Sequence, residues 1–133
     1  MLGVAWLLLF VLLIATLQGS RSSRFELSAD GLRIRGDLYG RLIPIPQLRG
    51  GSARQIDLAA ERELRPTVRT FGTAVGGYAS GWFRLASGEK ALLYVTDRRR
   101  VVYIPTTEGY SLLLSVQEPE LFVSRLREIA PAT

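Results

Sequence analysis

The residues of this chain that could take part in chemistry are serines, carboxylates and basic side chains, because it has no Cys and no His. No thiolate or imidazole can act, and the usual zinc ligands are missing. The serines have no His to activate them, and the aspartates adjoin expected turns or strand ends without forming a recognisable pair: Asp30, Asp37, Asp57 and Asp97. We therefore expect no enzyme and no metal, catalytic or cofactor site; a deep pocket holding two close carboxylates would argue otherwise.

The basic residues suggest an anionic partner, since the net charge is +5. Arg33 and Arg35 alternate along an expected strand and share a face, from which two guanidinium groups could bind phosphate. A solvated sheet face is the alternative. Arg98, Arg99 and Arg100 form a basic turn, and each arginine near an anionic membrane adds about 1 kcal/mol of attraction. The alternative there is an exposed turn that prevents edge pairing. These five arginines are the candidate contacts for anionic lipid or a partner.

Three aromatic residues alternate with expected core positions, namely Trp82, Tyr94 and Tyr103. An exposed aromatic patch would indicate a groove for a partner, but half-buried packing explains the same pattern. Binding of nucleic acid through base stacking needs basic and aromatic residues interleaved on one surface. The tyrosines meet this only loosely, so we predict no nucleic-acid binding.

The N-terminal segment is strongly apolar from residue 2 to residue 17. A membrane-spanning helix needs about 17–25 such residues, so this run is at the short limit. Trp6 suits a membrane interface, and Arg21 and Arg24 follow the run directly, which favours the cytoplasm for the downstream chain. We therefore expect residues 1–19 to form a single-pass anchor in the cell membrane, with residues 20–133 as a cytoplasmic domain.

Two other interpretations of this segment stay open. A cleaved signal peptide would export the domain, although the run has no basic region before it and no Ala-x-Ala cleavage site. The start could also be incomplete, with a longer helix or another helix before Met1.

A β-hairpin is predicted at the centre of the domain. Residues 82–85 alternate apolar and polar side chains, and residues 91–95 are almost wholly apolar, as in a strand buried on both faces. Gly88, in the turn between them, can adopt a positive φ at no steric cost. We expect the other strands to add on each side of this hairpin.

Short alternating strands separated by turns run from Phe25 to Ser115, with Asp30-Gly31 as a clear hairpin signal. The prolines of residues 41–46 make that strand an edge, or end it. Residues 59–77 are predicted as a long glycine-rich loop.

A C-terminal helix follows, with Pro119 in its first turn; a start at Ser115, with Glu118 completing a capping box, is the alternative boundary. We expect a PH-like barrel of about seven antiparallel strands, bent into two near-orthogonal sheets or a partly open barrel, with the helix closing the open end. Four apolar helix residues should cover four core residues; these are Leu121, Phe122, Leu126 and Ile129 on the helix, and Phe83, Leu85, Leu93 and Ile104 in the core.

Several motifs resemble the bacterial PH-domain (pleckstrin-homology-like) family over about residues 24–130. They are Phe25-x-Leu27 with Gly31-Leu32-x-Ile34, Ile43-Pro44-Ile45, Arg69-Thr70 with Gly72-Thr73, Gly77-Tyr78, Gly81-Trp82-Phe83-x-Leu85, Gly88, Lys90 to Asp97, Tyr110-x-Leu112-Leu113-Leu114-Ser115, Pro119-Glu120-x-Phe122 and Leu126. The resemblance implies a PH-like barrel capped by a helix in a small membrane-associated protein. It implies little about chemistry, and the lysines with which eukaryotic members hold phosphoinositides are missing near Arg33.

These observations predict a membrane-tethered PH-like binding or scaffold module at the cytoplasmic face of a bacterial membrane. Residues 2–17 would hold it at the bilayer. Its partner would be a protein, the anionic lipid surface or a second copy of the chain. The alternative is an exported envelope sensor or assembly domain, placed outside by a signal peptide or an inverted anchor.

Overall fold

The structure is a computed structural model that describes residues 25–35, 40–75 and 78–133. The expected anchor, with the boundary between residues 19 and 20, lies outside these residues. Among the helices of the described residues, none has the length and apolar character needed to cross a membrane.

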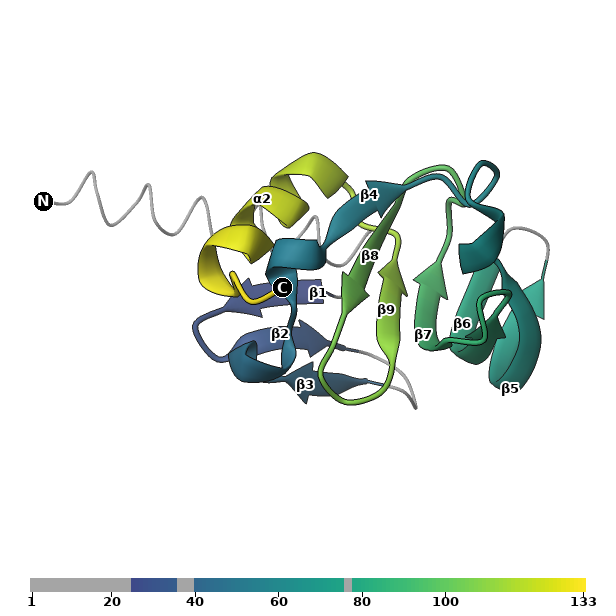
Figure 1. Ribbon diagram of the computed structural model, residues 1–133, viewed down its shortest axis with the longest axis horizontal. Coiled ribbons are helices and arrows are strands. Elements are labelled where there is room, and N and C mark those ends of the chain that lie inside the picture. The colour runs from purple at the N-terminus through teal and green to yellow at the C-terminus, as the bar shows by residue number, and fades with distance from the viewer. Residues whose placement is uncertain (1–24, 36–39, 76–77) are drawn as a thin grey trace, which may run out of the picture.

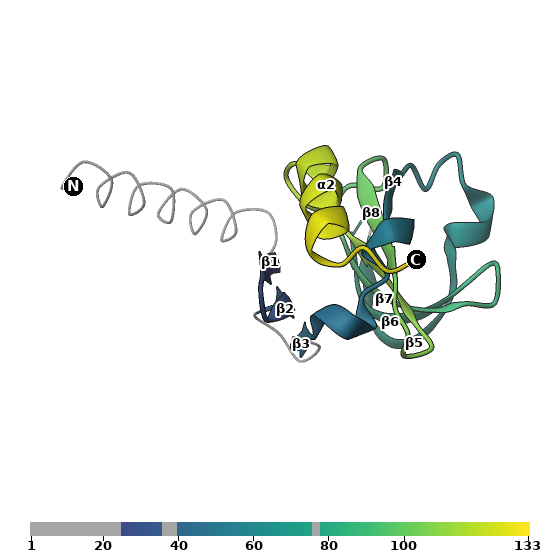
Figure 2. The ribbon, with the colours of Figure 1, turned by 60° about the vertical axis from the view of Figure 1, so that its left-hand side comes forward.

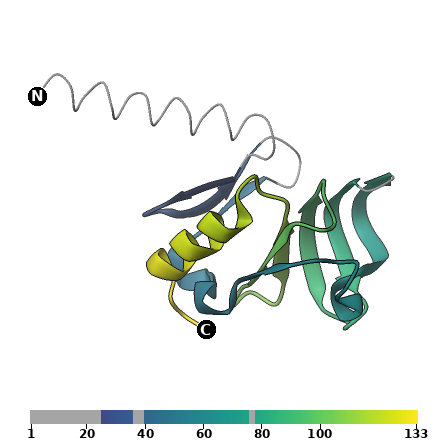
Figure 3. The same cartoon turned by 90° about the horizontal axis from the view of Figure 1, so that it is seen from above.

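Two sheets and one α-helix make up the described part of the chain (Figure 1). The small sheet has the order β1 (Phe25–Ser28), β2 (Gly31–Ile34), β3 (Arg41–Ile43). The large sheet has the order β4 (Arg54–Ile56), β8 (Val101–Pro105), β9 (Ser111–Leu114), β7 (Lys90–Val95), β6 (Tyr78–Leu85), β5 (Pro66–Val75). Three 3-10 turns are η1 (Ile45–Gln47), η2 (Gly50–Ser52) and η3 (Arg62–Leu64), and helix α2 is Pro119–Ile129. Figures 2 and 3 show the small sheet and α2 on the same side of the large sheet.

Of the two expected arrangements, the described residues form two sheets and no closed barrel, and the expected all-antiparallel pairing of about seven strands is wrong, because β7 and β9 are parallel. Nine strands lie in the described residues, and they form two separate sheets. The break falls after β3, because Pro44 and Pro46 have no N–H to donate to a ladder. The chain there forms η1 instead of continuing toward β4 as a strand. The mainly β architecture with a C-terminal helix is confirmed.

The predicted loop at residues 59–77 is also wrong in its second half. Residues 66–75 form β5, which pairs antiparallel with β6 along its length, with register shifts after Pro66 and after Arg69. Its glycines weaken the local preference for a strand, but pairing with a neighbouring strand overrides that preference. The first half is irregular, as predicted, and joins the two edge strands of the large sheet, β4 and β5.

Both predicted hairpin turns are confirmed. Gly31 has φ 133°, and a Cβ at this position would lie 2.1 Å from the Ile43 carbonyl oxygen, so only glycine fits there. Gly88 has φ 90° in the turn between β6 and β7. The two turns fix the register of the hairpins that they close.

The large sheet is buried on both faces, because β7 and β9 contribute side chains to a different core on each face. The inter-sheet core lies toward the small sheet and α2; its members include Leu32, Ile34, Ile43, Leu48, Leu92, Val102, Ile104, Leu112, Leu114, Val123 and Leu126. The second core contains Ile56, Leu58, Leu64, Phe83, Leu85, Ala91, Leu93, Val95, Val101 and Leu113. The irregular segment 57–65 covers this second core. It starts at a bond from Leu58 N–H to the Arg98 carbonyl and ends at bonds to residues 86 and 87.

Strand β9 lies between β7 and β8 and is parallel to β7, so the chain between β7 and β8 must pass over the end of β9. Ser115, which is 5% exposed, holds this crossing. Its Oγ accepts hydrogen bonds from the N–H groups of Thr96 (3.0 Å) and Asp97 (3.1 Å), and its own N–H donates to the Tyr94 carbonyl (2.8 Å). The alternative capping box at Ser115 is therefore wrong: the N-cap of α2 is Glu118, and the helix has no side-chain cap.

Helix α2 packs on the inter-sheet core and does not close an open barrel end. Val123 and Leu126 are buried there with Ile104, and Phe122 and Ile129 pack beside them. The expected contacts to Phe83, Leu85 and Leu93 are wrong, because these residues belong to the second core. Leu121 was also expected to be covered but is 47% exposed. It lies two residues, about 200° of helix rotation, from the buried Val123.

The burial of the helix predicts the effect of one matched pair of substitutions. Leu126→Ala should lower the free energy of unfolding by about 2–5 kcal/mol, because it empties a fully buried site. Leu121→Ala on the same helix should change it by less than about 0.5 kcal/mol. Urea titrations of both variants in mild detergent would measure this, and equal losses would contradict the described packing of α2.

The Ser115 contacts predict a second effect on stability. Ser115→Ala should cost about 1–3 kcal/mol, because it leaves two backbone N–H groups without their acceptor. Ser124→Ala, at an exposed position on α2, is the control and should be nearly neutral. Amide hydrogen exchange at Thr96 and Asp97 should become faster in the Ser115 variant alone; unchanged exchange would show that the hydroxyl does not hold the crossing.

Candidate binding surfaces

The turn of Asp97 to Arg100, here called the arginine turn, presents three exposed arginines after β7. Its backbone is fixed: Asp97 Oδ1 accepts from Arg99 N–H at 3.0 Å, and the Arg98 carbonyl accepts from Leu58 N–H at 2.9 Å. Arg100 also reaches the Gln117 carbonyl at 3.4 Å. Because the turn joins two internal strands, β7 and β8, it does not protect a sheet edge. The arginine turn is therefore a rigid cationic surface.

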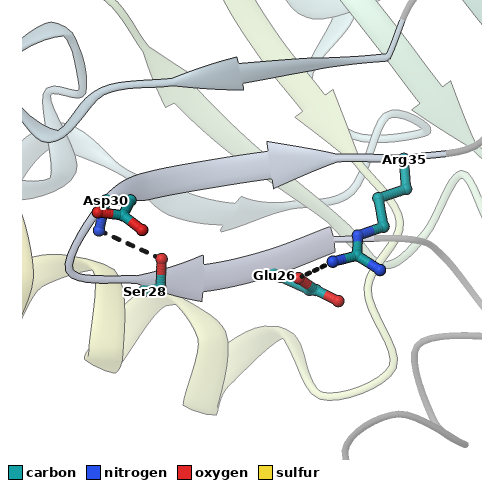
Figure 4. A network of polar contacts seen from close by, with 4 residues as sticks. All are labelled: Glu26, Ser28, Asp30 and Arg35. Atoms are coloured by element: carbon teal, nitrogen blue, oxygen red, sulfur yellow. Dashed lines mark hydrogen bonds and ion pairs between the residues drawn. The ribbon is translucent and has the colours of Figure 1, made fainter.

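Arg33 and Arg35 lie on the outer face of the small sheet, as expected, and both are exposed. Arg35 forms an ion pair with Glu26 at 3.0 Å (Figure 4), and Arg33 lies opposite Glu26 in the β1–β2 register. Leu42, which is 41% exposed, neighbours Arg33 from β3. This face carries mixed charge, so it is a weaker anion site than the arginine turn. The structure places the two groups of arginines on different sheets.

The arginine turn lies at the end of the domain where the chain enters β1. The ring of Phe25, the first residue of β1, packs edge-on against Tyr94 with centroids 5.9 Å apart. The Tyr94 carbonyl bonds to Ser115, whose hydroxyl holds the start of the arginine turn. This short series of contacts connects the entering chain to the three arginines.

A second cationic surface was not identified from the sequence. It surrounds the half-buried Trp82 and is here called the Trp82 cluster: Arg41, Trp82, Arg84, Lys90 and Tyr110. The Arg41 guanidinium carbon is 4.9 Å from the Trp82 ring centroid, and Lys90 Nζ is 4.7 Å from it. The Tyr110 ring meets the indole edge-on at 5.1 Å. Arg84 lies directly opposite Lys90 in the β6–β7 register. The sequence offered one signal for this surface, namely Arg84 and Lys90 on either side of the turn at Gly88. Arg41 and Tyr110 come from other strands or turns.

Tyr103 is half-buried on the other face of the large sheet. Its hydroxyl donates to Glu89, with oxygen distances of 2.8 and 2.9 Å, and the Arg54 guanidinium carbon is 5.6 Å from its ring centroid. Burial is the main cause that raises the pKa of the Tyr103 hydroxyl, and the bond to Glu89 adds to it. The phenol is therefore a fixed donor at neutral pH. The expectation of half-buried packing is confirmed for Trp82, Tyr94 and Tyr103 alike.

The described residues offer no constellation for metal binding. No group of three or more carboxylates, Cys or His among them could hold an ion. Every buried side-chain nitrogen and oxygen in the described part of the chain has a hydrogen-bond partner.

Comparison with known proteins identifies a family for this chain. The family described as "Bacterial PH domain" matches residues 23–130. Searches of curated proteins and of solved structures each gave no match. PH domains are generally non-enzymatic modules that bind proteins or lipids. The match spans most of the chain, and the chain belongs to the bacterial PH-domain family.

Proposed function

We propose that this protein is a membrane-tethered, non-enzymatic binding module whose PH-like domain docks on the cytoplasmic face of a bacterial membrane through the arginine turn. Residues 2–17 serve as the tether, and Arg21 and Arg24 keep the domain on the cytoplasmic side. The domain then presents its remaining surface to a protein partner.

The observation that carries the proposal is the position of the arginine turn at the end where the chain enters β1. Residues 18–24 separate the apolar run from Phe25 and can span at most roughly 25 Å. The end of the domain that holds Phe25, Tyr94 and the arginine turn therefore stays within that distance of the bilayer. Electrostatic attraction falls off over about 8 Å at physiological salt, so the cations at this end are the ones placed to act on the lipid surface. They are the arginine turn and Arg35, which follows the register partner of Phe25 and is already paired with Glu26.

The expected strength of this docking is modest. The three arginines add about 1 kcal/mol each at an anionic surface. Such a term is too weak for stable membrane binding without a tether, but it is enough to orient a domain that is already held there. A partner would then meet the face turned away from the lipid.

Docking can be tested with a unique label, because the chain has no Cys. Thr96→Cys places a fluorophore beside the arginine turn, and Thr107→Cys places one in the exposed β8–β9 turn. In nanodiscs containing anionic lipid and a headgroup quencher, the label at residue 96 should be quenched at least about twofold more than the label at residue 107. High salt should remove the difference, because the attraction is screened.

Two double variants that remove the same number of charges distinguish an effect of the arginine turn from an effect of net charge. Arg98→Ser with Arg99→Ser should reduce the quenching at residue 96, whereas Arg62→Ser with Arg125→Ser, at two other exposed positions, should not. Arg100 is kept because it contacts Gln117. Equal quenching of the two labels, or equal effects of the two double variants, would contradict docking through the arginine turn.

The cytoplasmic placement predicts the behaviour of a reporter fused after Thr133. A reporter active only in the cytoplasm should be active, and an alkaline phosphatase fusion, active only outside, should be silent. The opposite result would replace the proposal with an exported envelope sensor or assembly domain.

A further inference from the structure

We propose that the Trp82 cluster is the docking surface for an acidic segment of a protein partner. This inference rests on the proposed function as a binding module and names the chemistry of its partner. The cluster combines three cations from β3, β6 and β7 with two aromatic rings.

The placement of the cations is unfavourable for the isolated domain. Arg84 and Lys90 lie directly opposite each other on neighbouring strands, and like charges in this arrangement destabilise a sheet. Arg84 is held by the Gly88 carbonyl at 2.7 Å, and Lys90 lies over the indole. Neither is in an ion pair with a carboxylate among the described residues, where the ion pairs are Arg35–Glu26 and Arg54–Glu61. An acidic ligand would supply the missing negative charge.

The carboxylate nearest in sequence does not supply this charge. Glu89 precedes Lys90, but its side chain is bound by the Tyr103 hydroxyl, which belongs to the second core on the opposite face of the sheet. Glu108 lies in the β8–β9 turn, two residues before Tyr110, and accepts a hydrogen bond from Thr107 at 3.3 Å. It is exposed, and the ion pairs of the described residues do not include it.

The aromatic residues favour a protein segment as the ligand. Trp82 and Tyr110 are half-buried and meet edge-on. Their rings therefore offer apolar surface and lose little side-chain conformational entropy when a ligand binds. Trp, Tyr and Arg are the residue types that dominate binding energy at protein interfaces. An extended acidic chain can place carboxylates on Arg84 and Lys90 while its side chains cover the rings.

The position of the cluster argues against lipid as its ligand. Lys90 begins β7 and the arginine turn follows the end of that strand at Val95. Six residues of strand span roughly 20 Å. When the arginine turn faces the bilayer, Arg84 and Lys90 at the far end of β7 are beyond the reach of lipid headgroups at physiological salt. Arg41 lies nearer the entering chain, because it is opposite Ile34, the register partner of Phe25.

Trp82 itself can report binding in the full-length protein. The chain has two tryptophans, so Trp6→Phe leaves Trp82 as the single indole. An octaglutamate peptide, titrated into this variant in nanodiscs of zwitterionic lipid, should change the Trp82 emission saturably. An octaglutamine peptide should not. High salt should weaken the binding, because the contacts are charged.

Three charge variants distinguish binding of octaglutamate at the Trp82 cluster from its general attraction to a positively charged protein. Lys90→Gln and Arg84→Gln should each weaken octaglutamate binding roughly two- to fivefold, the upper range of an exposed ion pair. Arg125→Gln, which removes an exposed charge from α2, should leave it unchanged. Circular dichroism of each variant would confirm that the fold is retained.

Four outcomes would overturn the proposal. The first is an equal loss of affinity in Arg125→Gln, and the second is the absence of a saturable change of Trp82 emission with octaglutamate. The third is a saturable change with inorganic phosphate or phosphatidylglycerol vesicles instead of octaglutamate. The fourth is a change of emission with protein concentration alone, which would indicate a second copy of the chain. A failed docking test at the arginine turn would leave the octaglutamate result intact, so the two proposals fail separately.

Discussion

The insertion of β9 between β7 and β8 is the constraint on which the rest of this structure depends. All four residues of β9 are buried, and its three leucines alternate between the two cores. Because β9 runs parallel to β7, the β7–β8 connection has to cross the end of β9. That crossing is the arginine turn, held by the Ser115 hydroxyl. An exposed cationic surface of the domain is thus a direct consequence of its fully buried strand β9.

Local patterns were enough to predict most of the individual strands, the two glycine turns and the buried nature of residues 91–95. They did not predict how the strands combine. A parallel pairing between β7 and β9 leaves no local signal, because it depends on which strand enters the gap between two others. The strand at residues 66–75 was missed because its glycines indicate a loop and its stability comes from pairing with β6. The anchor at residues 2–17 lies outside the described residues and stays a prediction.

The candidate sites divide in the same way, into features that local sequence predicts and features that depend on how the elements pack together. The five arginines were identified because charge and turn signals are local, and the structure confirms that all five are exposed. The Trp82 cluster was missed because Arg41 belongs to the small sheet, whose packing over Trp82 no sequence spacing reveals. The same is true of the helix, whose apolar stripe was visible while its partner core was assigned to the wrong face of the sheet.

Arg84 and Lys90 of the Trp82 cluster lie at one end of β7 and the arginine turn follows the other end, and this gives the domain a polarity. The arginine turn is tied to the entering chain through Phe25 and Tyr94, whereas Arg84 and Lys90 flank the turn at Gly88. Between them β7 is paired on both sides and buried in both cores, so the strand cannot bend to bring the surfaces together. A rigid spacer of this kind would keep a lipid surface and an acidic partner apart by the length of one strand. With no pocket chemistry required, such a domain would work by holding its partner at a set distance from the membrane.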